Sequence, residues 1–323
     1  MKGLLREGLL KHLRLNEVID GNCGTHSIKQ YMFEDDTFDP FSHIESDSDV
    51  ITDPIDEKND CVLGFSNGNS KLEWPYFSLP AGFTCPMATV CKNFAAEPGG
   101  KKFSDGKSIL KGKDAEFLCY AARAQSQYPP VYKSAHRNFD LINGAKKDGG
   151  VEAMARLILK SLRYHGLDNS KVFRIHESGD FYDDAYMKAW IAVASELPGT
   201  LFYAYTTSLP FWINNKGSIP KNLKLIASMD KNNAKTIMDN NLRYSIVVYS
   251  LEQAKELGLK IDVDDSLAWG SNDNFALLLH GGQHSGTDAA EAMKSIRKTG
   301  ADKRVKKAYA NNRNNKLQQL NNL

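Results

Sequence analysis

The chain has 323 residues, of which 41% are hydrophobic and 25% charged. These values are typical of a folded globular protein and exclude a disordered or fibrous one. The net charge of +2 does not by itself indicate a nucleic-acid or membrane partner. No apolar run approaches the roughly twenty residues that cross a bilayer, and Glu7 interrupts the amphipathic start. We therefore expect a first surface helix, no membrane partner and a cytoplasmic location.

Residues 1–60 are an acidic, weakly periodic segment. Asp and Glu dominate from Glu34 to Asp60, where Lys58 is the single Lys or Arg. Clusters of Asn, Gly and Asp in this segment favour turns. We predict an acidic N-terminal extension that packs on the core.

Residues 61–290 are predicted to form one α/β domain, which begins with the cysteine region. Cys85 and Cys91 follow Pro80 and Gly82, so we expect both cysteines in a loop. A polar stretch rich in Gly and Lys, interpreted as an insertion, then leads to Cys119, where the helical run CYAARAQSQY starts. A thiolate at a helix N-terminus is favoured by the helix dipole.

The cysteine count favours a metal site over a disulfide framework, because five is an odd number and the cytosol is reducing. Three cysteines that converge suit a [4Fe–4S] cluster with a differentiated fourth iron. Three unrelated buried cysteines are the alternative. We expect Cys23 and Cys61 to be structural, with Cys61 as a candidate fourth ligand.

Short apolar runs alternate with helical patterns from residue 150 to residue 290, which predicts a parallel sheet. The runs are apolar on consecutive residues, as expected of strands buried on both faces. The predicted strands are 172–176, 201–208, 222–230, 244–250 and 275–282, and the predicted helices are 151–166, 183–199, 231–241 and 252–258.

Polar residues recur where these strands should end, which favours a (β/α) barrel or partial barrel, because barrel sites form at the carboxyl ends of several strands. An open, doubly wound sheet is the alternative. The strand-end residues are His176, Glu177, Asp180, Thr206, Thr207, Ser208, Ser228, Asp230, Tyr249, Ser250 and His280.

The segment HESGDF supplies the candidate catalytic residues His176, Glu177 and Asp180. Such a group can bind an amine or hydroxyl, ligate a metal or move protons. The alternative for Asp180, as for Asp183, is capping of the following helix.

The segment LLLHGGQHSGTDAA runs from a strand through a Gly-rich turn into a helix that starts near Asp288. Backbone N–H groups in such a turn can hold an anion. The side chains predicted to bind a small-molecule or nucleotide substrate are Thr206, Ser208, Asp230, His280 and His284.

Residues 291–323 are predicted to be a basic C-terminal helical tail. Lys and Arg recur from Lys294 to Lys316, and Asp302 is the single Asp or Glu in this range. A basic tail can neutralise phosphates, or it can be the solvated face of a last helix. Nucleic acid is therefore a candidate partner, and the sequence does not define an oligomeric state.

Three segments taken together resemble the phage Gene product 88 family: FSLPAGFTCPMATVC followed by CYA, FRIHESGDFY with YAYTTS, and LLLHGGQHSGT. The family pattern places the third cysteine closer to the second than in this chain. The cysteine set is also similar to the cluster loops of radical S-adenosylmethionine enzymes, which hold a [4Fe–4S] cluster near the top of a partial barrel. The CxxxCxxC spacing of those enzymes is absent. This second resemblance implies S-adenosylmethionine as a further ligand, with Glu177 and Asp180 near its amino group.

The leading hypothesis is a phage-type iron–sulfur protein. Its [4Fe–4S] cluster would be held by Cys85, Cys91 and Cys119 at the mouth of an α/β barrel, with redox or radical chemistry on a small molecule or nucleotide. The alternatives are a nucleic-acid-acting phage replication protein and a zinc-stabilised, non-catalytic binding module.

Overall fold

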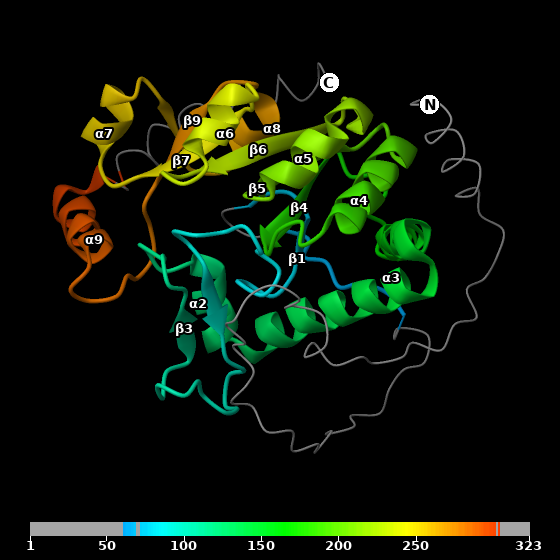
Figure 1. The fold of residues 1–323 in the computed structure, drawn as a ribbon, viewed down its shortest axis with the longest axis horizontal. Coiled ribbons are helices and arrows are strands. Elements are labelled where there is room, and N and C mark those ends of the chain that lie inside the picture. The colour runs from blue at the N-terminus through cyan, green and yellow to red at the C-terminus, as the bar shows by residue number, and fades with distance from the viewer. Residues whose placement is uncertain (1–60, 69–71, 302, 304–323) are drawn as a thin grey trace.

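The computed structural model describes residues 61–68, 72–301 and 303. Its centre is a parallel sheet of seven strands in the order β1-β4-β5-β6-β7-β9-β8 (Figure 1). The strands are β1 (Tyr76–Ser78), β4 (Val172–Ser178), β5 (Leu201–Thr206), β6 (Leu223–Met229), β7 (Tyr244–Val248), β8 (Lys260–Asp262) and β9 (Phe275–Leu278).

Helices connect these parallel strands, as crossover connections require. The N-terminal part contains α2 (Tyr120–Gln127) and α3 (Pro129–Tyr164), and α3 bends where Gly149 and Gly150 leave helical geometry. The other helices are α4 (Asp184–Glu196), α5 (Leu209–Asn215), the 3-10 turn η2 (Lys216–Ser218), α6 (Ala234–Asp239), α7 (Leu251–Glu256), α8 (Ser266–Gly270) and α9 (Asp288–Thr299). Among the helices of the described residues, none is both long and apolar enough to cross a bilayer.

The predicted mainly parallel β/α organisation is confirmed, but the sheet does not close into a barrel. The strands β1 and β8 lie at its two edges and pair with one neighbour each. Both edge strands have only three residues. From β4 to β7 the spatial order follows the chain order, so this part of the sheet contains no topological switch point.

Alternate residues of the strands divide the core into two faces. Phe173, Phe202 and Leu225 pack with α3, α4 and α5 in the main core. On the opposite face, Tyr203 and Ile226 pack with Trp269 of α8, together with Val172, Phe275, Ala268 and Trp74. The helix α8 therefore fills a position that would be the interior of a closed barrel.

A bulge in β4 changes which way its last residues point. Tyr76 pairs with Arg174 and Ser78 pairs with Ser178, so three residues of β4 stand opposite one residue of β1. In a regular strand Arg174 and His176 would share a face. Instead the His176 ring contacts Phe181 beside the main core, while Arg174 faces α8. The bulge places the Arg174 and His176 side chains on opposite faces of the sheet.

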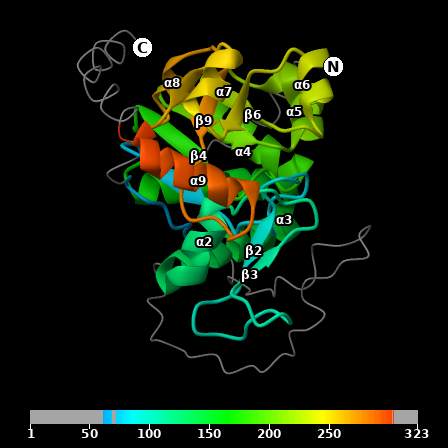
Figure 2. The same ribbon diagram turned by 90° about the vertical axis from the view of Figure 1, so that its left-hand side faces the viewer.

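The predicted insertion before Cys119 folds as an antiparallel hairpin of β2 (Asn93–Ala95) and β3 (Ile109–Lys111). Figure 2 shows the hairpin beside α2 at one end of the molecule. Past the hairpin, the backbone N–H of Gly112 bonds the carbonyl of Lys92, and the N–H of Glu116 bonds the carbonyl of Val90. The chain thus returns to the position from which it left.

The predicted strands and helices from 151 to 282 are all present, and most of their ends are shifted by a few residues. The predicted helix 151–166 is the second part of α3, which begins at Pro129. The acidic extension 1–60 and most of the basic tail lie outside the described residues, so both stay predictions. The predicted helix near Asp288 is α9, and its residues Ala289, Met293 and Ile296 pack on β7 and β9.

Candidate functional site: three thiols at the carboxyl edge of the sheet

Cys85 and Cys91 lie in a loop, as the turn signals predict. This segment, the cysteine loop, lies over the carboxyl ends of β1 and β4. Gln125 of α2 fixes the start of this loop, since its amide accepts from the Ala81 N–H at 3.0 Å and donates to the Leu79 carbonyl at 3.1 Å and the Ser178 hydroxyl at 2.9 Å. The N–H of Asp180 bonds the Thr84 carbonyl at 3.1 Å. These bonds join the cysteine loop to the end of β4.

Gly179 makes this close approach possible. Its φ of +83° lies in the left-handed region, which favours glycine. A Cβ there would lie 2.5 Å from Thr84 Oγ1 and 2.6 Å from Leu79 Cβ. The glycine of HESGDF is thus required by the contact with the cysteine loop.

Cys119 reaches the same place because of the β2–β3 hairpin. The Asn93 side-chain amide donates to the Cys91 carbonyl at 3.0 Å and to the Phe117 carbonyl at 3.2 Å. Cys119 is the N-cap residue of α2, as predicted, although its thiol makes no capping hydrogen bond of normal geometry. The insertion therefore separates Cys91 and Cys119 in sequence but not in space.

The three thiols are free and influence one another electrostatically. Burial raises the pKa of each, although all three residues keep part of their surface exposed. The charges of Asp180, Cys91 and Cys119 raise the pKa of Cys85 further, and those of Cys119, Asp180 and Asp230 raise the pKa of Cys91. Backbone groups of Ala121 and Ala122 partly oppose the rise in the pKa of Cys119.

Asp180 does not cap the following helix. Its carboxylate accepts hydrogen bonds from the Thr206 hydroxyl at 2.6 Å, the Thr207 N–H at 2.7 Å, the Thr207 hydroxyl at 2.8 Å and the Phe181 N–H at 2.7 Å. Asp183 is the cap of α4, where it accepts from the Tyr186 N–H. The Asp180 carboxylate is buried and joins β4 to β5.

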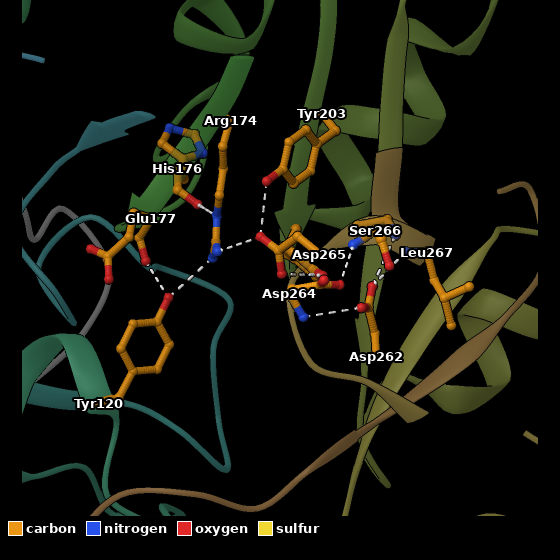
Figure 3. Close-up of polar contacts among 12 residues, drawn as sticks. Tyr120, Arg174, His176, Glu177, Tyr203, Asp262, Asp264, Asp265, Ser266 and Leu267 are labelled. Atoms are coloured by element: carbon orange, nitrogen blue, oxygen red, sulfur yellow. Dashed lines mark hydrogen bonds and ion pairs between the residues drawn. The ribbon is translucent and has the colours of Figure 1, made fainter. Parts of the chain in front are cut away.

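Glu177 lies beside Tyr120, the residue after Cys119. The Tyr120 hydroxyl donates to the Glu177 carbonyl and accepts from Arg174 Nη2 at 3.0 Å (Figure 3). The Glu177 carboxylate accepts a long hydrogen bond of 3.3 Å from the Ser78 hydroxyl. Burial raises the Glu177 pKa, and the positive charge of Arg174 opposes this rise.

Arg174 lies at the centre of a buried polar network on the α8 side of the sheet. Its Nη1 bonds Asp265 Oδ2 at 2.7 Å, and the same carboxylate accepts from the Tyr203 and Tyr205 hydroxyls at 2.9 and 3.1 Å. Figure 3 shows Arg174 between Tyr120 and Asp265. Asp265 adopts a left-handed φ of +62° in the turn before α8. The network connects the Cys119 side of the site to α8.

His176 lies inside the protein. Its Nε2 is 3.1 Å from the Tyr186 hydroxyl, and its Nδ1 is buried without a partner. Burial and the charge of Arg174 lower its pKa to about 3, so the imidazole is neutral at pH 7. In this position it packs α4 against β4.

Three of the predicted substrate-binding side chains make bonds within the protein. Thr206 bonds Asp180 and accepts from the Ser208 N–H, and the Ser208 hydroxyl donates to the Phe181 carbonyl at 2.7 Å. Asp230 accepts from the Thr89 hydroxyl at 2.7 Å. All three lie at the carboxyl edge and support the loops there.

The segment 280–284 contacts the Cys119 side of the site. The side-chain amide oxygen of Gln283, Oε1, accepts from the Leu118 N–H at 2.7 Å, and the His280 ring lies 5.6 Å from the Tyr120 ring. His280 is exposed, whereas His284 Nε2 is buried without a hydrogen-bond partner. The backbone at Gly282 passes close to the Arg123 side chain of α2, and a Cβ added at this glycine would overlap the Arg123 guanidinium.

The three cysteines have free thiols, which are the ligand type that an iron–sulfur cluster needs. Within the described residues, no group of three or more His, Cys, Asp or Glu side chains forms a ready site for a metal ion. Cys61 is disulfide-bonded and is therefore not available as a fourth ligand in this conformation.

Sequence patterns did not identify the Arg174–Asp265–Tyr203 network, Gln125 or Thr89. Arg174 lies in an apolar strand and Asp265 follows a strand that was not predicted. Tyr203 and Tyr205 lie two residues apart in β5. Only their shared strand position hinted that their hydroxyls meet one partner.

The fold and the site define an α/β protein that gathers three thiols and two carboxylates at the carboxyl edge of an open parallel sheet. The chain belongs to the Gene product 88 family, whose sequence model matches residues 55–303. It is 25% identical over 183 residues to the Gene 88 protein of Mycobacterium phage L5, covering 55% of this chain and 67% of the relative. It is also 25% identical over 158 residues to the Gene 88 protein of Mycobacterium phage D29, covering 48% of this chain and 56% of that relative. No solved structure matches.

Proposed function

We propose that this Gene product 88 protein binds a [4Fe–4S] cluster through Cys85, Cys91 and Cys119. The observation that carries the proposal is that three free thiols from separate segments lie at one edge of the sheet, where their charges influence one another's pKa. Burial and neighbouring carboxylates make their thiolates unfavourable without a cation. Iron coordination would remove this penalty, because a bound metal deprotonates its thiol ligands.

A cluster with an open fourth iron would supply redox or radical chemistry on a small molecule or nucleotide. S-adenosylmethionine is the candidate co-substrate. Glu177 and His280 are the side chains proposed to contact the ligand, since Glu177 makes only one long side-chain hydrogen bond and His280 is exposed beside Tyr120. Asp180 would act indirectly, because its hydrogen bonds hold the end of β5 against the cysteine loop. We propose the cytoplasm of an infected bacterium as the place of action.

Metal analysis of protein purified without oxygen tests the proposal. The expected result is brown protein with stoichiometric iron and sulfide. Replacement of any one of the three cysteines by Ala should abolish the colour, whereas Cys23→Ala, outside the proposed ligand set, should keep it. Colourless protein with full zinc occupancy would reject the cluster and support the zinc-stabilised binding module.

A separate experiment tests the proposed radical chemistry with S-adenosylmethionine. Reduced, iron-loaded protein is incubated with S-adenosylmethionine, and 5′-deoxyadenosine is expected as a product. Its absence from a fully loaded sample would leave the cluster but remove this chemistry. The replication alternative depends on the basic tail, most of which lies outside the described residues, and it fails if DNA binding is undetectable at low salt.

A further inference from the structure

The loop after β6 contacts the cysteine loop through Asp230 and Thr89. Asp230 Oδ2 accepts the Thr89 hydroxyl at 2.7 Å, and its Oδ1 accepts the backbone N–H groups of Asn232 and Asn233 at 2.7 and 3.2 Å. The Asn232 amide also donates to Thr89 Oγ1 at 3.0 Å. The Thr89 hydroxyl thus has a fixed donor and a fixed acceptor, two residues before Cys91.

The same loop also reaches the segment before Cys119. Lys231 Nζ lies 2.6 Å from Glu116 Oε1. This pair is exposed, so we assign it little energy. It shows, however, that one short loop, 230–232, contacts the residues that precede both Cys91 and Cys119.

We propose that Asp230 is a positioning residue that anchors the Cys91 end of the cysteine loop through Thr89 and places a negative charge beside the metal that Cys91 binds. The second half of this proposal rests on the proposed function, but the first half does not. The Asp230 carboxylate bonds Thr89, two residues before Cys91, and therefore lies on the Cys91 side of the cysteine loop. We thus assign Asp230 the role of supporting the cysteine loop, in place of the substrate-binding role predicted from the sequence.

Hydrogen exchange of the full-length protein, followed by mass spectrometry, tests the anchor whether or not iron is bound. Thr89→Val keeps the shape of the side chain but removes the hydroxyl. Exchange in residues 85–91 should become faster on the order of tenfold, because a hydrogen bond to a charged group is lost. Thr89→Ser should restore the wild-type rate, and Thr236→Val on α6 is the matched control. Equal rates in the wild type and in Thr89→Val would overturn the anchor.

The reduction potential of the iron-loaded protein tests the charge. Asp230→Asn keeps a hydrogen-bonding partner for Thr89 but removes the negative charge, so reduction becomes easier and the potential should shift to a more positive value. Thr89→Val should not shift it. An unchanged potential in Asp230→Asn would overturn the charge effect alone. Wild-type protein without iron would overturn both the proposed function and the charge effect, while the exchange rates would still decide the anchor.

Discussion

Asn93 bonds the carbonyl of Phe117, 24 positions further along the chain, while it also bonds the carbonyl of Cys91. One buried side chain therefore fixes the spacing between two segments that carry proposed metal ligands. Asn93→Leu keeps a similar volume but leaves two carbonyls without these donors. We expect a loss of about 1–3 kcal/mol in the free energy of unfolding, measured by denaturant titration. Asn272→Leu at an exposed position should change it little, and equal midpoints for both variants would contradict this role.

The Arg174–Asp265 ion pair should be far more important for stability than the surface pairs. Its side chains are 10% and 11% exposed, compared with 85% and 57% for Lys235 and Asp239. Asp265→Ala leaves a buried guanidinium without its counter-charge, so we expect a loss of about 3–5 kcal/mol. Asp239→Ala should cost less than about 0.5 kcal/mol. Thermal and denaturant unfolding of both variants measure the difference, and similar losses would show that solvent reaches Arg174.

The neutral state of His176 predicts a pH dependence. Its pKa is about 3 in the folded chain and about 6.5 when unfolded. Below pH 6.5 the unfolded chain binds a proton that the folded chain does not bind, so the contribution of neutral His176 is full above pH 6.5 and is lost toward pH 3. Between those values, His176→Phe should gain about 1.4 kcal/mol relative to the wild type for each unit of falling pH.

The comparison requires unfolding free energies of both proteins at several pH values between 7.5 and 5. Ser126→Ala, which removes no titratable group, should run parallel to the wild type. A constant difference between His176→Phe and the wild type would mean that the imidazole is accessible to protons in the folded state.

Gly179→Ala should be much more damaging than Gly106→Ala, although both glycines have a positive φ. A Cβ at Gly106 meets nothing within 4 Å, so only backbone strain of about 1 kcal/mol is expected. At Gly179 the Cβ would also overlap Thr84 and Leu79, which raises the expected loss to about 2–5 kcal/mol. Thermal unfolding measures both, and iron content should fall in Gly179→Ala alone.

Most of the β/α order could be predicted because each strand is a short apolar run followed by a helical pattern. The helix start at Cys119 and the loop at Cys85 and Cys91 were also predicted correctly. The strand β8 was missed, since it has only three residues and no apolar run. Closure of the sheet could not be judged from sequence, because it depends on the edge strands and on the packing of α8.

The strand-end positions of the predicted polar residues are confirmed, while the pairing of their polar atoms could not be read from sequence. Asp180 and Asp230 lie at strand ends as expected, yet their carboxylates bond Thr206, Thr207 and Thr89. The bulge in β4 also turns His176 into the core, and no residue pattern in the strand signals that bulge. Local spacing predicts which edge of a sheet a residue occupies, but long-range contacts decide its partner.

The paired ends of the β2–β3 hairpin make its tip a practical attachment point. Because Gly112 returns to Lys92 before the chain reaches Cys119, the geometry of the thiols does not depend on how many residues lie between Gly99 and Gly106. A fluorophore or affinity peptide grafted there would be carried away from the sheet edge. The segment between Cys91 and Cys119 thus offers a handle for immobilising the protein without disturbing its cysteines.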